Sequence, residues 1–357
     1  MRTTTALIAA LAFTIPTALT QSQADPLAAE IDRWSALLAA DARSDALWLD
    51  AKKGGETVLA QARQELQQGR RLVALERLAA AEQTLGAALY AIERPPAERK
   101  ELAAFEAEWK RMGVALRDVV SAGEGNDLAG SIRPAFVRAL AELSTAQARE
   151  SYAASLEYGR NTEPQYGLYY LGAARAHRRF LDLARSLPPP QGGRAPALRS
   201  LSAEIDALQG DLLAAYRPPA AIEQHGDFIV ASAALKEARE LDGSGRRHAA
   251  LLRYLQAAQR VAALRPATAV DSSSVKRRLE QSAARLDRAV DHSVGRFFVE
   301  RAESALASSS AGGGEATAAA VVMDVLPRYF AALEPARAAA SAREPQVTVT
   351  LVRWPFT

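Results

Sequence analysis

The sequence lacks cysteine and has few aromatic side chains. Of its 357 residues none is cysteine and 6% are Phe, Trp or Tyr, whereas 49% are hydrophobic. The absence of thiols excludes disulfide bonds, thiolate metal sites and cysteine nucleophiles. β-Branched residues are sparse, and alanine and leucine supply most of the apolar share, a composition that favours helices over strands. We therefore expect an almost entirely α-helical protein.

Familiar catalytic motifs are also missing. The sequence has no His-Glu-x-x-His zinc motif, no Gly-x-Ser-x-Gly turn, no phosphate-binding or dinucleotide-binding glycine loop and no calcium loop. The four histidines, at 177, 225, 248 and 292, lie far apart in the sequence. We expect no metal, no cofactor and no catalytic residue. His177 and His248 stand beside arginines, and we interpret them as parts of solvated basic helix faces.

The first 24 residues are typical of a secretory signal peptide. One positive charge at Arg2 precedes an apolar run over 6–15, and Ser22 and Ala24 place small residues at the predicted cleavage site. A membrane anchor is less favoured, because the run is shorter than the ~18–20 residues that a membrane span needs. We expect cleavage near Ala24 and export, to the periplasm in the first instance and otherwise to the exterior.

The charge balance argues against a nucleic-acid partner. The chain carries 44 basic and 41 acidic side chains, a net charge of +3, and nearly all of the basic residues are arginine. Nucleic-acid binding depends on a concentrated positive field, which this near balance does not supply. Export would also separate the protein from nucleic acid. We expect a protein or peptide partner instead.

Apolar residues recur at helical spacing along most of the chain, and clusters of proline or glycine separate the segments. The proline- and glycine-rich stretch 188–195 is a linker or a long loop between an N-terminal helical region (25–187) and a C-terminal one (196–340). In the tail (341–357), the alternation over 347–352 predicts one extended strand, for which we find no partner strand in this chain. The helices are predicted from Asp25 through Leu38 and over 56–68, 71–92, 97–121, 133–158, 163–187, 196–216, 219–241, 246–264, 273–307 and 315–334.

An internal repeat pairs residues 59–85 with residues 235–261. The two segments align without gaps and are identical at 11 of 27 positions, including a glycine followed by two arginines between two predicted helices. The second helices share the spacing Gly69, Ala74, Leu78, Ala81 and Gly245, Ala250, Tyr254, Ala257. This spacing resembles the second helix of a tetratricopeptide repeat, although the first helices lack that family's usual residues and the copies are not adjacent. The resemblance implies helical hairpins stacked as a short solenoid or a curved bundle.

Tyrosines and arginines cluster near the middle of the sequence. Tyrosine and arginine are favoured where proteins hold partners, because each joins a flat contact area to hydrogen-bonding groups. Interhelical packing is the alternative role for each tyrosine. As a group these residues form our candidate partner-binding surface: Tyr152, Tyr158, Arg160, Tyr166, Tyr169, Tyr170, Arg175, Arg178 and Arg179.

A second candidate contact lies in the predicted helix 273–307. Its apolar positions alternate steps of four and three, as in a coiled-coil seam: Leu279, Ala283, Leu286, Val290, Ser293 and Phe297. Filled by the protein's own helices, the seam is ordinary core. Exposed, segment 275–297 would support self-association, and its flanking basic residues would allow contact with an anionic membrane surface, an option that interspersed acidic residues disfavour.

Three functions remain open on this basis. The favoured one is an exported, non-catalytic helical-repeat protein that binds or scaffolds a protein or peptide partner in an interhelical groove. One alternative is an all-helical enzyme acting on envelope polysaccharide or peptidoglycan, since a pair of carboxylates has no sequence motif. The other is a self-assembling structural component of the cell envelope.

Overall fold

The computed structural model describes residues 25–120, 127–189, 193–216, 222–265, 270–286, 290–308 and 314–333. These residues are predominantly α-helical, and among them the only β contact is an isolated bridge between Arg194 and Val290. The predicted all-α class is therefore confirmed. The predicted signal peptide and the strand predicted at 347–352 lie outside the described residues.

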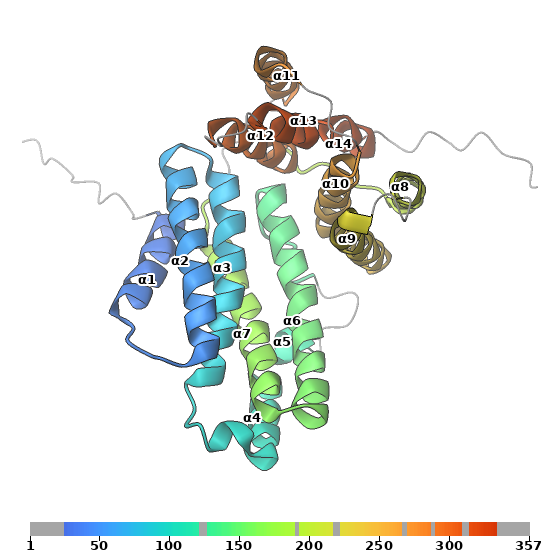
Figure 1. Cartoon of the computed structure of the whole chain (residues 1–357). Coiled ribbons are helices and arrows are strands. Elements are labelled where there is room, and N and C mark those ends of the chain that lie inside the picture. The colour runs from blue at the N-terminus through green and yellow to red at the C-terminus, as the bar shows by residue number, and fades with distance from the viewer. Residues whose placement is uncertain are drawn as a thin grey trace, which may run out of the picture.

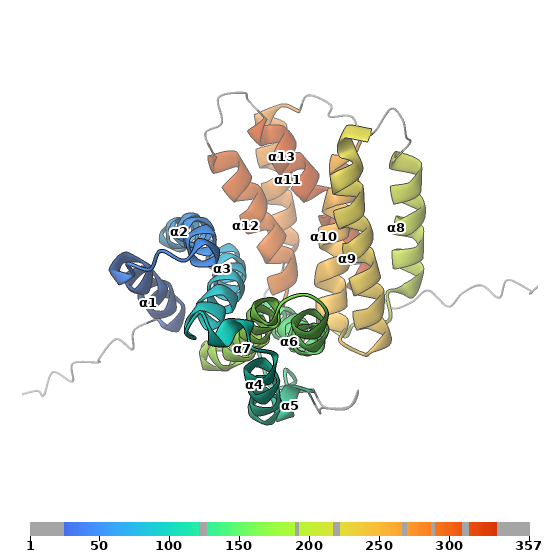
Figure 2. The same cartoon turned by 60° about the horizontal axis from the view of Figure 1, so that its bottom comes forward.

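The N-terminal helices form a bundle, and the C-terminal helices run across one end of it. Figure 1 shows α1, α2, α3, α6 and α7 lying alongside one another, with α4 at the end of the bundle far from the C-terminal helices and α5 beside α6. In Figure 2 helices α8, α9, α10 and α12 stand side by side, seen with the N-terminal bundle nearly end-on. The N-terminal α-helices are α1 (Pro26–Ala40), α2 (Ala46–Gln67), α3 (Arg71–Ile92), α4 (Leu102–Ala115), α5 (Arg117–Val120), α6 (Ala135–Asn161) and α7 (Pro164–Ser186). The C-terminal ones are α8 (Ser202–Ala215), α9 (His225–Gly243), α10 (Arg247–Ala263), α11 (Ser272–Arg285), α12 (Ser293–Ala307), α13 (Glu315–Met323) and α14 (Leu326–Leu333).

Local sequence explains where α1 and α2 begin. The Asp25 side chain accepts a hydrogen bond from the Leu27 N–H at 3.1 Å, so it caps α1, and Pro26 occupies the first turn. Asp45 caps α2 in the same way, and α2 begins at Ala46, ten residues before the start of the helix predicted over 56–68. That prediction was too short: Gly55 lies inside α2, where its missing side chain makes room for Leu85 of α3.

The two copies of the internal repeat fold into equivalent hairpins, α2/α3 and α9/α10. The turn glycines, Gly69 and Gly245, have φ angles of +79° and +77°, a backbone region that glycine adopts without strain. The N–H of the next residue donates to a carbonyl five residues back in both turns, Arg70 to Glu65 and Arg246 to Leu241, at 2.9 Å each. The alanines that the two repeat copies share at equivalent positions, Ala74 with Ala250 and Ala81 with Ala257, are buried. The likeness to tetratricopeptide repeats itself stays a prediction.

Buried acidic and hydroxyl side chains join the two helical regions by capping helices of other hairpins. Glu300 of α12 accepts hydrogen bonds from the first turn of α3, at Leu72 (2.7 Å) and Val73 (3.1 Å). Asp291 and Ser293 cap α6, and Glu142 of α6 accepts from the N–H of Ala249 in α10 at 3.0 Å. Each cap satisfies N–H groups that a helix leaves unpaired. One hydrophobic core accordingly includes residues from both regions.

The predicted continuous helix 273–307 is wrong. Helix α11 ends at Arg285, and α12 begins only at Ser293. The Asp291 N–H donates to the Arg194 carbonyl at 2.9 Å, and its side chain caps α6, so tertiary hydrogen bonds hold this residue outside a helix. The proposed seam is broken, because Ala283 is exposed on α11 while Phe297 is fully buried in α12.

The prediction for 315–334 also joined two helices, α13 and α14. In the described part of the chain, Glu315–Leu333 is the one stretch long and apolar enough to cross a membrane by length and composition. Half of it is buried inside the fold, and buried side chains such as Ala319, Leu326 and Tyr329 belong to the main core. Its apolar character is thus explained by packing within the protein.

Candidate functional site

The structure divides the predicted tyrosine and arginine group among several environments. Tyr152 is buried beneath α4, where its ring stacks on Trp109 at a centroid distance of 5.0 Å and its hydroxyl donates to the Trp109 carbonyl. Burial also raises its pKa. Tyr158 stacks on Tyr170 at 4.6 Å, and Tyr169 meets Tyr170 edge to face. These side chains form a small surface on the α6/α7 hairpin.

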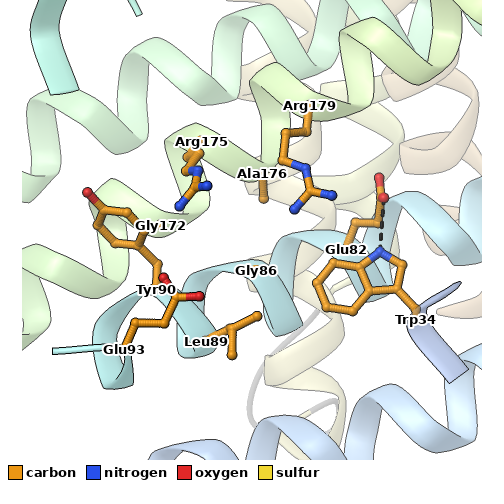
Figure 3. Close-up of a pocket in the computed structure, with 10 residues that line it drawn as sticks. All are labelled: Trp34, Glu82, Gly86, Leu89, Tyr90, Glu93, Gly172, Arg175, Ala176 and Arg179. Carbon is orange, nitrogen blue, oxygen red and sulfur yellow. Dashed lines mark hydrogen bonds between the residues drawn. The ribbon is translucent and has the colours of Figure 1, made fainter. Parts of the chain in front are cut away.

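The remaining predicted residues lie apart from that stack or are already paired. Tyr166 is 46% exposed. Arg160 binds Glu106 of α4, and Arg178 binds Asp118 and Asp182. Arg175 and Arg179 instead line a pocket beside α3 (Figure 3).

Arg175 and Arg179 both line a small pocket between α1, α3 and α7. Its volume is about 50 Å³, and Trp34, Tyr90, Glu82 and Glu93 contribute to its walls. Figure 3 shows Arg175 and Arg179 reaching from α7 toward the side chains of α3 and α1. The helices approach closely here because Gly86, Gly172 and Ala176 are small: a Cβ at Gly172 would lie 2.6 Å from the Tyr90 Cβ.

A larger interhelical groove separates the bundle from the α9/α10 hairpin. It consists of two adjoining cavities of about 530 and 340 Å³, which share Glu76, Arg253 and Gln256 in their linings. Helices α3, α6 and α7 supply one side, α9 and α10 the other, and Arg301 of α12 an end. The volumes fall within the range of ligand pockets, roughly 300–1,000 Å³.

The internal repeat lines this interhelical groove from both sides. Arg77 and Gln83 of α3 correspond in the repeat to Arg253 and Gln259 of α10, and all four side chains line the groove. The two hairpins thus present related polar faces to one space. The repeat in the sequence already indicated that the two hairpins have related polar faces. That these faces line one groove depends on how the hairpins pack.

A chain of polar contacts crosses the groove through five helices. Gln147 of α6 donates to Glu237 of α9 at 3.4 Å, and Glu237 pairs with Arg253 of α10 at 2.8 Å. Arg253 donates to Gln256 at 2.8 Å, and Gln256 donates to Glu76 of α3 at 3.2 Å. Glu76 also accepts from Arg301 at 3.4 Å. The groove therefore offers both hydrogen-bond donors and acceptors.

His177 lines the deeper, less polar cavity of the groove together with Leu140, Leu143 and Phe180. It is 5% exposed, and its Nε2 atom has no hydrogen-bond partner. Burial lowers its pKa to about 4, and the charge of Arg253 acts in the same direction, so the ring is neutral near pH 7. A buried polar atom without a partner is uncommon and marks a place where a ligand group could bind.

The interpretation of His177 and His248 as solvated was wrong. His248 is 8% exposed and its Nδ1 lies 3.2 Å from Glu142 Oε1. The neighbouring arginines suggested a basic face, but helical spacing places His177 on the same face as Ala174 and Leu181, which are buried. That spacing was the available signal, and it was missed.

Carboxylates also line the groove. Burial raises the pKa of Glu237, against the opposing effect of Arg253. No group of three or more His, Cys, Asp or Glu side chains in the described ranges is arranged to hold a metal ion.

Comparison of the chain with protein-family models, with curated proteins and with solved structures found no significant match.

Proposed function

We propose that this protein is an exported, non-catalytic binding protein that holds a peptide segment of a protein partner in the interhelical groove. The observation that carries the proposal is an open groove crossed by a chain of donor and acceptor side chains that includes Gln147 and Gln256, with Gln259 also in its lining. An extended peptide presents N–H and C=O groups in alternation, which amide side chains can match. The apolar end near Phe180 suits an apolar side chain of the same peptide.

The edge of the groove adds apolar contact area. Val230 of α9 lines the groove and is 43% exposed, and Ile229 beside it is 52% exposed. Exposed apolar groups next to ordered polar groups are typical of surfaces that bind partners. Affinity would come from burial of this apolar area, and selectivity from the polar chain.

Export forms part of the proposal. Asp25, the first residue after the predicted cleavage site, caps α1 and accepts a hydrogen bond from Arg71 of α3 at 2.6 Å. Cleavage after Ala24 therefore leaves every described contact of α1 in place. The test is to express the full gene, separate the exported from the cytoplasmic fraction and sequence the N-terminus of the protein in each. Asp25 as the first residue in the exported fraction supports export, and protein confined to the cytoplasm with Met1 retained refutes it.

Site-specific photocrosslinking in cells tests the groove. Ala80 of α3 and Ala233 of α9 are exposed and line different cavities of the groove, whereas Ala284 of α11 is exposed and lines neither of them. A photoreactive phenylalanine at 80 and at 233 should capture the same partner, and at 284 it should not. Capture at Tyr166 without capture at 80 or 233 would refute the groove and favour the tyrosine surface.

Purified components give the second half of the test. A synthetic peptide copied from the crosslinked segment should bind the protein, and Ala80→Trp or Ala233→Trp should weaken binding at least about tenfold by filling the groove. Ala284→Trp is the matched control and should change binding less than twofold. Equal effects of all three variants would contradict the proposal.

Glycan hydrolysis is the second candidate, and Glu237 favours it. A carboxyl with a raised pKa suits a general acid, and Glu76 supplies a second carboxylate in the same cavity. Incubation with purified peptidoglycan should then release reducing ends, and Glu237→Gln should abolish the release. A wild-type protein that releases nothing removes this candidate.

A further inference from the structure

The pocket of Figure 3 contains two arginines, Arg175 and Arg179, that form no salt bridge with any residue of the described ranges. Two further arginines stand at the same aromatic rings but are paired: Arg33 over Trp34 binds Glu30, and Arg94 over Tyr90 binds Glu108. Arg175 and Arg179 also face these rings, at 5.4 Å from Tyr90 and 5.9 Å from Trp34. Within the described part of the chain neither makes a hydrogen bond or an ion pair.

A buried carboxyl group adjoins these arginines with one oxygen unused. Glu82 is 4% exposed, its Oε1 accepts from the Trp34 Nε1–H at 3.0 Å, and its Oε2 has no partner. Burial raises its pKa to about 8, and the nearby charge of Glu30 adds to this effect while Arg179 opposes it. Near pH 7 the group is therefore mostly protonated. Because Glu82 interacts with the neighbouring carboxyl group of Glu30 and is held by Trp34, it lines the pocket as an uncharged wall that would not repel a bound anion.

These groups suit one kind of ligand. Paired guanidinium groups bind carboxylate and phosphate through charged hydrogen bonds, and arginine geometry matches such planar or branched oxyanions. The volume of about 50 Å³ accepts the anionic group alone, so the rest of a ligand lies outside. We propose that this pocket binds a single oxyanion group, carboxylate, phosphate or sulfate, between Arg175 and Arg179.

This site is separate from the interhelical groove and does not depend on the proposed function. The pocket shares only Ala176 with the groove lining. Its one exposed acidic side chain is Glu93, at the rim. Glu93 would repel a bound anion, so removing its charge should strengthen anion binding, whereas removing either arginine should weaken it.

Calorimetric titration of the purified full chain with sodium phosphate, sodium sulfate and sodium acetate tests the site. Low ionic strength is needed, because salt screens such attraction. At least one anion should bind saturably with one site per chain. Arg175→Gln and Arg179→Gln should each weaken binding about tenfold or more, since each removes a charged hydrogen-bond donor from the anion. Preference for phosphate or sulfate would indicate a tetrahedral group, and preference for acetate a carboxylate.

Arg178→Gln is the matched control. It removes the same charge from the same helix, but Arg178 is held by Asp118 and Asp182 and does not line the pocket. It should change affinity less than twofold, and Glu93→Gln should strengthen binding about two- to threefold. Absence of saturable binding by all three anions, or an equal loss in Arg178→Gln and Arg179→Gln, overturns the proposal. Helical circular dichroism confirms that each variant folds.

Discussion

Adding one methyl group at Gly172 should destabilise the protein although alanine is the better helix former. Gly172 lies where α7 crosses α3, and a Cβ there would stand 2.6 Å from the Tyr90 Cβ, 2.8 Å from the Ala87 carbonyl oxygen and 2.9 Å from the Ala87 Cα. Two of these atoms belong to the backbone of α3 and cannot rotate away. The helices must therefore separate.

The size of the effect follows from two opposing contributions. Carbon atoms make their best contact at about 3.5–4.0 Å, so the new methyl group overlaps its neighbours by about 1 Å. Overpacking of this kind costs about 1–3 kcal/mol. Replacing a helical glycine by alanine stabilises the helix by about 1 kcal/mol, which offsets part of this cost. Because two of the overlapping atoms are backbone, we expect a cost in the upper half of that range, about 2–3 kcal/mol, so Gly172→Ala should lower the free energy of unfolding by about 1–2 kcal/mol net.

Gly54 provides the control for the same chemical change. It lies inside α2, and a Cβ there would meet nothing within 4 Å, so Gly54→Ala should stabilise the protein by up to about 1 kcal/mol. Urea unfolding followed by circular dichroism at equal protein concentration measures both variants. A Gly172→Ala protein as stable as wild type would refute the close helix crossing, and so would destabilisation by Gly54→Ala.

Three further predictions concern stability. Gly69→Ala and Gly245→Ala should each cost about 1 kcal/mol in urea unfolding, because both turns need a positive φ; a neutral result at either position would contradict the shared turn geometry. Glu142→Ala should lower the free energy of unfolding by about 2–3 kcal/mol, because α10 loses its cap and buried donors lose their acceptor. Glu150 is exposed on the same helix, and Glu150→Ala should change this free energy by under about 0.5 kcal/mol. Burial raises the pKa of Glu300 from 4.5 to about 7, so its contribution to stability is fully present below pH 4.5 and is lost as the pH rises through 7. Over this interval the wild type should lose up to about 3 kcal/mol of unfolding free energy relative to Glu300→Gln. Parallel pH profiles of the two proteins would contradict the assignment.

Local features of the sequence were enough to predict most helices. Helix α3 occupies 71–92 as predicted, and α1 buries Leu27, Ile31, Trp34 and Leu38, which recur in the sequence at steps of four and three. Helical periodicity and capping residues act within a few positions of one another, so both can be recognised without knowledge of the fold. The shared turn of the internal repeat was predictable for the same reason.

The errors arose where distant residues compete with local preference. Asp291 leaves the expected helix because its hydrogen bonds to Arg194 and to α6 replace helical ones. Gly55 stays within α2 because Leu85 of another helix fills the space beside it. Neither partner lies near in the sequence, and periodicity alone carries no information about them.

The candidate sites show the same division. The sequence by itself determined the all-helical class, the hairpin turns and the unusual number of tyrosines and arginines near 152–179, because composition and short-range spacing encode these features. Only the tertiary structure decided that Arg175 and Arg179 line a pocket together with Glu82, and that His177 lines a groove together with side chains of α3, α6 and α10. The physical reason is that a site needs side chains from several helices to converge, and the packing of helix faces fixes that convergence.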